Sequence, residues 1–295
     1  MGRTHSRGYV RTATLLLVMS ALAVALVGSS IVYSSPQSPP ATGWQRLEPG
    51  LELGVLFPSQ VPEGGNALVR VLRIDPRWFE LRLLNASNPA YNRPLSAKMW
   101  CTQHGLVAAI NASMYQTDHL TSVSLMRTKT HTNNARLTRD KAILAFDRQN
   151  LGVPLVKIID RECEDFEAWK NNYSSFVQSI RMISCKGKNV WNQQQKKWST
   201  AAIGTDEEGK VLFIHVRSPF STHDLINILM GLPLKLSRLM YVEGGTEAQL
   251  YVRSGTQDYD FIGSYDSGFG GDERESYAMP IPNVVGIARR DKPLE

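Results

Sequence analysis

Short apolar segments, separated by turn-forming residues, follow one another along most of the chain. Several alternate apolar and polar residues, as Val69–Arg73 and Glu80–Leu83 do, and this period of two is typical of strands with one buried face. The sequence predicts eleven strands: Leu51–Leu56, Ala67–Ile74, Phe79–Leu84, Leu106–Ile110, Ala142–Phe146, Leu155–Ile159, Phe176–Ser184, Lys210–Val216, Leu239–Val242, Gln249–Val252 and Val284–Ala288. Because no regular strand–helix alternation accompanies them, we expect α+β rather than a doubly wound sheet.

Only three segments predict helices. They are Leu95–His104, which Gly105 ends, then Cys163–Asn171, and a third that begins near Ser221. In the third, Ser221 and Asp224 have the spacing of a capping box. We therefore expect one domain with mixed or antiparallel sheets and a few helices.

The first residues predict export. Arg3, Arg7 and Arg11 precede an apolar run over Ala13–Val27, which is the pattern of a secretory signal. Extended to Tyr33, the run is long enough to cross a bilayer, so an uncleaved signal-anchor stays open. We expect a periplasmic or extracellular protein, tethered to the inner membrane by residues 13–33 if the signal is not cleaved.

The predicted organisation follows from that signal. Residues 1–33 are the signal peptide or signal-anchor, residues 34–43 a Pro/Ser linker, and residues 44–295 one domain. Export permits disulfides, and Cys163 with Cys185 is the favoured pair because they flank one predicted helix. Cys101 then remains a buried free thiol.

The formal net charge of +6 does not predict a nucleic-acid partner. Half of it belongs to the N-terminal arginines, and the remaining charge is of mixed sign without a long basic run. The cysteine spacing fits no zinc motif, so no metal and no cofactor are predicted. The chain also lacks the G-x-S-x-G, H-E-x-x-H, Walker and G-x-G-x-x-G motifs.

Two strand ends carry candidate site residues. An apolar strand ends at Asn111 and is followed by Tyr115, which suits contact with sugar hydroxyls, although an asparagine that caps a turn explains the pattern too. A second strand ends at Glu243, and Glu247 follows after two glycines. Carboxylates at a strand end beside glycines suit acid, base or nucleophile chemistry. The alternative is a Gly-Gly hairpin turn.

Two polar connections could hold an anion. Arg217 precedes the predicted capped helix, whose free N–H groups could receive a phosphate. His131 and Asn133 lie in a basic segment ahead of the strand Ala142–Phe146. A plain strand-to-helix connection and a solvated loop are the respective alternatives.

Taken in order, these segments resemble the phosphodiester glycosidase family, which includes the lysosomal uncovering enzyme and bacterial exopolysaccharide-related proteins. The segment Ala108–Tyr115 is similar to a family strand that ends in Asn-Gly-Gly, with Asn111 matched. Ala202–Asp206 looks like the family's Ala-Ile-Gly strand with its acidic turn. Glu243–Glu247 resembles Asp-Gly-Gly-Gly-Ser, matched at Gly244 and Gly245. Pro282–Ile287 looks like the closing strand, with Asn283 matched.

The departures from the family pattern place the chain in a divergent bacterial subgroup. Thr200 stands where many members have Arg, a contact that Arg181 could supply. Glu243 stands in the Asp position, and Thr246 and Glu247 replace Gly and Ser.

The resemblance implies hydrolysis of a glycosyl–phosphate bond in a sugar phosphodiester or an envelope polysaccharide. It makes Glu243 the expected nucleophile or base and Glu247 the second catalytic candidate. The expected substrate-binding residues are Asn111, Tyr115, His131, Asn133, Arg181, Arg217, Gly244, Gly245 and Asn283. A non-catalytic protein that binds polysaccharide or peptidoglycan on the same fold is the alternative. A large separation of Glu243 from Asn111 would exclude catalysis.

Overall fold

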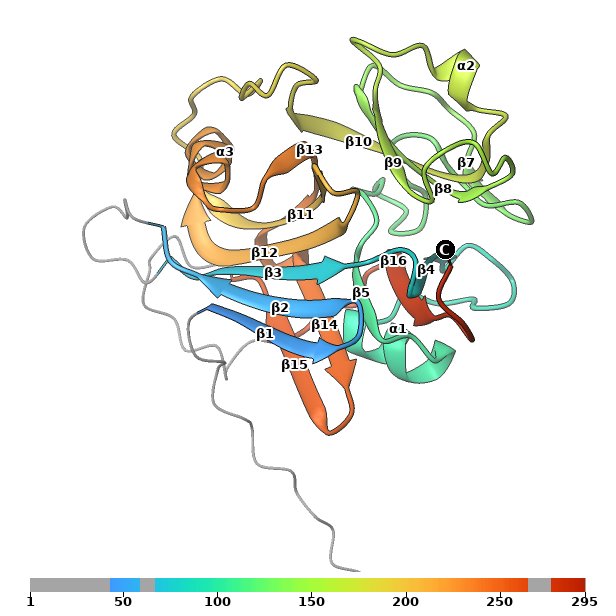
Figure 1. Ribbon diagram of the computed structural model, residues 1–295, viewed down its shortest axis with the longest axis horizontal. Helices are drawn as coiled ribbons and strands as arrows, with labels where there is room; N and C mark the ends of the chain where they lie inside the picture. The colour runs from blue at the N-terminus through green and yellow to red at the C-terminus, as the bar shows by residue number, and fades with distance from the viewer. Residues whose placement is uncertain (1–42, 59–66, 265–276, 295) are drawn as a thin grey trace, which may run out of the picture. The chain divides into compact units, whose positions relative to one another are not determined.

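Two antiparallel sheets dominate the computed structural model, which describes residues 43–58, 67–264 and 277–294 (Figure 1). In these residues the large sheet has eleven strands, in the order β1-β2-β3-β12-β11-β13-β10-β6-β7, with β8 paired to β10 and β9 paired to β8. Its strands are β1 (Gly43–Glu48), β2 (Leu51–Leu56), β3 (Val69–Ile74), β6 (Met126–Arg127), β7 (Thr132–Asn134), β8 (Ala142–Arg148), β9 (Lys157–Asp160), β10 (Tyr173–Ile183), β11 (Trp198–Asp206), β12 (Val211–Phe220) and β13 (Leu236–Gly244).

The small sheet has five strands in the order β15-β14-β5-β16-β4. They are β4 (Phe79–Asn85), β5 (Ala108–Asn111), β14 (Gln249–Ser254), β15 (Gln257–Ile262) and β16 (Asn283–Arg289). Every described strand pair in both sheets is antiparallel.

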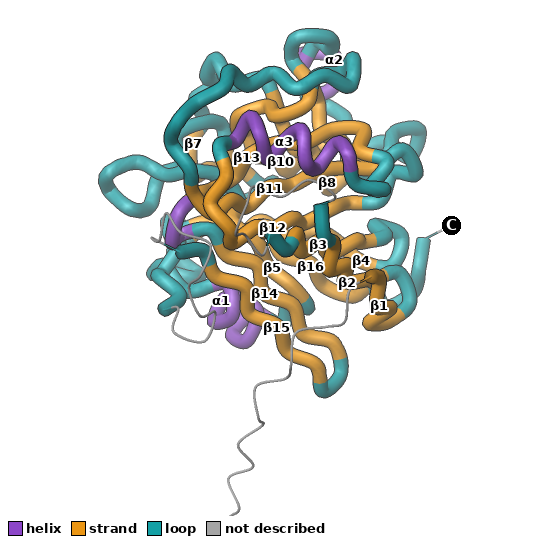
Figure 2. The backbone as a smooth tube through the Cα atoms, turned by 90° about the vertical axis from the view of Figure 1, so that its left-hand side faces the viewer, coloured by secondary structure: helices purple, strands orange, loops and turns teal. Residues whose placement is uncertain are grey.

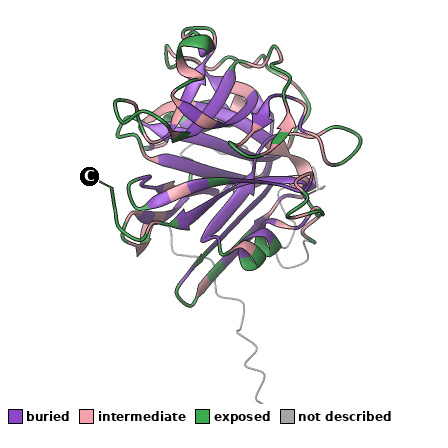
Figure 3. Cartoon of the chain, turned by 90° about the vertical axis from the view of Figure 1, so that its right-hand side faces the viewer, coloured by how far each residue is buried: buried purple, intermediate pink, exposed green. Residues whose placement is uncertain are grey.

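The main core lies between the two sheets. One apolar cluster combines buried side chains from both, such as Phe213 and Val242 of the large sheet and Ile110 and Val285 of the small one. Because the other face of each sheet is also covered, central strands such as β12 are buried along most of their length (Figure 3). Both faces of such a strand are mostly apolar, which explains the apolar run Val211–Ile214 of β12 ahead of the buried His215.

In the described part of the chain, three short α-helices cover the outer faces: α1 (Ala97–His104), α2 (Phe166–Trp169) and α3 (Thr222–Gly231). Figure 2 shows α3 against strands of the large sheet, where Leu225 and Leu229 join a second apolar cluster with Tyr241. Helix α1 buries Trp100 against the small sheet, and α2 covers β8 and β10 with Phe166.

The caps confirm the local helix signals. Ser96 accepts a hydrogen bond from the Met99 N–H, and Gly105 ends α1 at φ 65°. The Ser221 hydroxyl accepts from the Asp224 N–H at 3.1 Å, as the capping box predicts. Helix α2 is shorter than the predicted Cys163–Asn171, because residues ahead of Phe166 form a turn closed on Asp160.

All eleven predicted strands exist, with end points shifted by a few residues. The structure adds β1, β6, β7, β11 and β15. It is a single sheet-rich domain, more β than the predicted α+β, and no described strand pair is parallel. The disulfide between Cys163 and Cys185 and the buried free thiol of Cys101 are confirmed.

The predicted signal, and the predicted linker except for Gly43 at the start of β1, fall in residues 1–42, outside the described residues, so they stay a prediction. Within the described residues, no helix is both long and apolar enough to span a membrane.

Candidate active site

The segment after Glu243 carries the chain from one sheet into the other. Strand β13 lies between β11 and β10 in the large sheet and ends at Gly244. A single 3-10 turn, η1 (Gly245–Glu247), follows, and β14 begins at Gln249 in the small sheet. The two glycines therefore do not form a hairpin turn. Gly245 has φ 65°, a conformation that glycine adopts without steric cost.

Asn111, at the end of β5, fixes this crossing segment. Its Nδ2 donates to the Glu247 carbonyl at 2.7 Å, and its Oδ1 accepts from the Gln249 N–H at 2.8 Å. The side chain is 2% exposed. Asn111 and the two glutamates thus belong to one structural unit, although the amide's observed partners are backbone groups.

Two carboxyl groups come together on this unit. The Tyr115 hydroxyl donates to Glu247 Oε1 at 3.3 Å, and Glu243 Oε1 accepts from the Gly244 N–H at 3.0 Å. Burial, with a contribution from the neighbouring Glu247 charge, raises the pKa of Glu243 to about 8. Glu243 therefore carries a proton at neutral pH, and the site combines a proton donor with a second carboxyl group.

Aromatic side chains pack beside Glu243. A Cβ on Gly244 would overlap the Tyr241 hydroxyl and lie 2.7 Å from Trp198 Cδ1, so the missing side chain lets both rings approach the backbone. The Trp191 ring lies 5.7 Å from that of Tyr241. Burial, reinforced by the charges of Glu243 and Glu247, raises the pKa of Tyr241 well above its usual value, which keeps the hydroxyl a hydrogen-bond donor.

Thr200 lies next to the crossing segment, because it pairs with Gly244 across β11 and β13. Its buried hydroxyl has no hydrogen-bond partner among the described residues. A buried polar group without a partner is costly in a folded protein. The position where the family pattern has Arg therefore holds an unused hydroxyl on the residue opposite Gly244.

A row of buried amide side chains lies at the end of the small sheet that contains Asn111. Asn85, Asn111, Gln249 and Asn283 occupy four neighbouring strands there, and each is at most 2% exposed. Asn283 Oδ1 accepts from Asn85 Nδ2 at 2.8 Å and from Asn133 Nδ2 at 3.4 Å. We call these four side chains the amide row.

His131 and Asn133 join the amide row through a hydroxyl. Ser87 Oγ lies 2.9 Å from His131 Nε2 and accepts from Asn133 Nδ2 at 2.8 Å. Burial lowers the pKa of His131, so the ring is neutral at neutral pH. His131, Asn133 and Asn283 therefore make internal contacts in the structure, and their contact with substrate stays a prediction.

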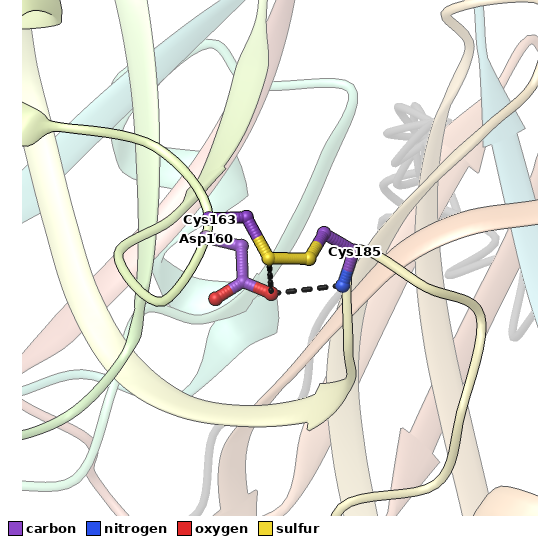
Figure 4. Close-up of side chains that lie close together, drawn as sticks. All are labelled: Asp160, Cys163 and Cys185. Carbon is purple, nitrogen blue, oxygen red and sulfur yellow. Dashed lines mark hydrogen bonds between the residues drawn. A yellow bond between two sulfur atoms is a disulfide. The ribbon is translucent and has the colours of Figure 1, made fainter.

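The two predicted arginines have different surroundings. Arg181 Nη1 donates to both oxygens of Asp160, at 2.8 and 2.9 Å. Asp160 also accepts from the Cys185 N–H beside the disulfide with Cys163 (Figure 4). Arg217 donates to the Ile262 carbonyl at 3.4 Å. Ile262 pairs with Gln249, the first residue of β14.

The carboxylate of Asp160 and the sulfurs of Cys163 and Cys185 are close enough to share a metal ion. The sulfurs are joined in a disulfide, however, and zinc sites use thiolates. In the oxidised protein this group is a structural brace.

The model of the phosphodiester glycosidase family matches residues 104–288, which include every catalytic candidate. The chain belongs to the phosphodiester glycosidase family. No curated protein matches it.

Solved structures share the fold of this phosphodiester glycosidase family member at low identity. A hypothetical protein from Synechocystis has a TM-score of 0.58 at 15% identity, over 86% of this chain and 64% of that one. The catalytic domain of zebrafish N-acetylglucosamine-1-phosphodiester alpha-N-acetylglucosaminidase has a TM-score of 0.56 at 15% identity, over 85% of this chain and 87% of that one. A Burkholderia pseudomallei protein described as exported has a TM-score of 0.51 at 9% identity, over 77% of this chain and 75% of that one.

Sequence reasoning missed the aromatic side of this family member's site. Tyr241 is two residues before Glu243, but Tyr241 pairs with Ala202 and Glu243 with Ala201, so a register shift separates them and a period of two does not place both side chains on one face. The sequence therefore gave no local signal for Tyr241. Trp191 and Trp198 gave none either, because they reach the site from a preceding connection and from a neighbouring strand.

Proposed function

We propose that the protein is a hydrolase that cleaves the glycosyl–phosphate bond of a sugar phosphodiester, free or within an envelope polysaccharide. The observation that carries this proposal is that Glu243 and Glu247 lie on one crossing segment, which the Asn111 side chain holds in place. Membership in the phosphodiester glycosidase family supports the same reaction class.

The raised pKa of Glu243 suggests a role other than the expected nucleophile or base. A protonated carboxyl group can lie against an anionic phosphodiester without charge repulsion. It can also donate its proton to the phosphate oxygen that leaves the anomeric carbon. We therefore assign Glu243 as the general acid.

Glu247 is the remaining carboxyl group and takes the opposite role. As general base it removes a proton from a water molecule that attacks the anomeric carbon. The bond between that carbon and the bridging oxygen breaks, and the products are a reducing sugar and a phosphomonoester. Tyr115 fixes the orientation of Glu247 through its hydroxyl.

The test compares Glu243→Gln, Glu247→Gln and the control Glu207→Gln on a sugar 1-phosphodiester with a nitrophenyl group on the phosphate. Glu207 lies in an exposed turn of the same chain. We expect kcat to fall by about 100-fold or more for the first two variants and to stay unchanged for the control. Phosphorus NMR identifies the nitrophenyl phosphate product. Undiminished turnover by folded Glu243→Gln would overturn its assignment.

The pH profile adds a second readout. Native activity should fall as the pH rises through about 8, because Glu243 then loses its proton. Any residual activity of Glu243→Gln should lack this alkaline fall.

Polysaccharide or peptidoglycan binding without catalysis is the second candidate. Thr200 in place of Arg, and the engagement of Arg181 with Asp160, favour it. Saturable glycan binding by the intact protein, with no turnover of any phosphodiester tested, would establish this alternative.

A further inference from the structure

A cavity of about 530 Å³ lies beside the aromatic side of the proposed active site. Its lining comes from β10, from the residues just before β8, and from the connection that precedes β11. The residues that matter for its chemistry are Arg139, Asp140, Lys141, Arg181, Trp191 and Asn192.

Guanidinium groups give this cavity its charge. Arg139 is exposed, and its side chain makes no hydrogen bond or ion pair with any described residue. Arg181 uses Nη1 for Asp160, while its buried Nε–H has no partner among the described residues. Planar guanidinium donors of this kind match phosphate and carboxylate oxygens.

The other charged lining groups are already engaged. Lys141 pairs with Glu162 at 3.0 Å. The Asp140 carboxylate accepts hydrogen bonds from the hydroxyls of Ser124 and Thr138 at 2.6 and 2.9 Å. Arg181 is ion-paired with Asp160 as well, so the preference of the cavity for an anion rests chiefly on Arg139, with the Arg181 Nε–H as an added donor.

Trp191 connects the cavity to the catalytic candidates. Its Nε1–H donates to the Arg181 carbonyl at 2.8 Å, which holds the indole in place. Its ring lies 5.7 Å from that of Tyr241, two residues before Glu243. An amphipathic ring at the edge of a polar cavity suits the apolar face of a sugar, and Asn192 adds an exposed amide.

We propose that this cavity binds an anionic sugar unit of the substrate, with its ring against Trp191 and its phosphate or carboxylate on Arg139 and Arg181. The proposal rests on the proposed function, since it names the part of the substrate beyond the bond that is cleaved. A phosphosugar and a uronate share this chemistry, and the probes below separate them.

The test titrates the folded protein with glucose 6-phosphate, glucuronate, glucose and inorganic phosphate. The Trp191 indole N–H resonance, assigned by its loss in Trp191→Phe, reports binding without any need for turnover. We expect saturable shifts with glucose 6-phosphate, glucuronate or both, and weaker binding of glucose and of phosphate alone.

Arg139→Ala should weaken binding of the anionic sugar by about 10-fold or more. The control is Arg136→Ala, which removes the same charge from the same exposed segment but lies outside the cavity. Equal binding of glucose and the anionic sugars, or equal effects of the two substitutions, would overturn the proposal. So would phosphate alone binding as tightly as the anionic sugars.

The two proposals fail in different ways. Anionic sugar binding without hydrolysis of any phosphodiester would refute the proposed function and leave the cavity assignment standing. Hydrolysis by a protein whose Trp191 resonance responds to none of the probes would refute the cavity assignment alone.

Discussion

The high pKa of Glu243 suits its proposed role as an acid, but it also makes the folded protein less stable as the pH rises. Its pKa is about 8 in the folded protein, against 4.5 for an ordinary glutamate. The folded state therefore keeps a proton that the unfolded state releases between these pH values. The stability associated with that proton is complete below about pH 4.5 and is lost as the pH rises through about 8.

Glu243→Gln should remove the loss of stability that the native protein shows as the pH rises. We expect the variant to be more stable than the native protein at about pH 8, by about 2 kcal/mol, or roughly 4–8 °C in Tm. The difference should shrink toward about pH 4.5, and thermal unfolding across this range measures it. A difference that does not change with pH would show that the carboxyl group does not titrate as described.

Gly244 has a role that depends on having no side chain. In Gly244→Ala the new methyl group would displace Tyr241 or Trp198, so we expect a loss of about 1–3 kcal/mol and reduced turnover. Gly231, at the end of α3, has open space at its Cβ position, and Gly231→Ala is the matched control. Urea unfolding that shows the two variants equally stable would contradict this account.

Asn111 shows what a local pattern cannot reveal. The sequence offered two roles for Asn111, the cap of a turn or a contact with sugar. Neither role describes the two hydrogen bonds that the side chain makes to distant backbone groups. Its partners, the Glu247 carbonyl and the Gln249 N–H, are 136 and 138 positions away. Only the assembled sheets bring them together.

At the scale of elements, predictions succeeded where the signals are local. Gly105 and Ser221 fixed helix ends because a cap bonds its own helix. Strand β11 had no comparable signal, since its small residues have low strand propensity and only the family resemblance marked Ala202–Asp206. The Gly244–Gly245 pair is equally compatible with a hairpin and with a crossing between sheets. Which of the two forms is decided by pairing with strands that are distant in the sequence.

The disulfide between Cys163 and Cys185 ties the segment after β9 to the end of β10. Replacing both cysteines by Ser should lower the free energy of unfolding by about 3 kcal/mol, because the unfolded chain gains freedom over a loop of this length. Reduction of the native protein should produce the same loss. Chemical denaturation that detects no change in either case would rule out this contribution.

At the scale of the whole molecule, export remains a proposal, which the disulfide supports because such bonds persist in oxidising compartments. We expect the protein in the cell envelope or medium. Its N-terminus should lie near Gly28–Ser30 if the signal is cleaved, or at Met1 in the membrane fraction if it is an anchor. Fractionation with N-terminal sequencing measures both. Recovery from the cytoplasm with reduced cysteines would contradict export.

The amide row has a consequence for hydrogen exchange. The N–H of Gln249 bonds the side chain of Asn111, and the N–H of Ala97, at the start of α1, bonds the side chain of Gln249. Backbone protons at the start of a helix and the end of a loop ordinarily exchange quickly with solvent. Here they can exchange only when the buried strand ends themselves open. Deuterium uptake at these positions should therefore be as slow as in the centre of the small sheet.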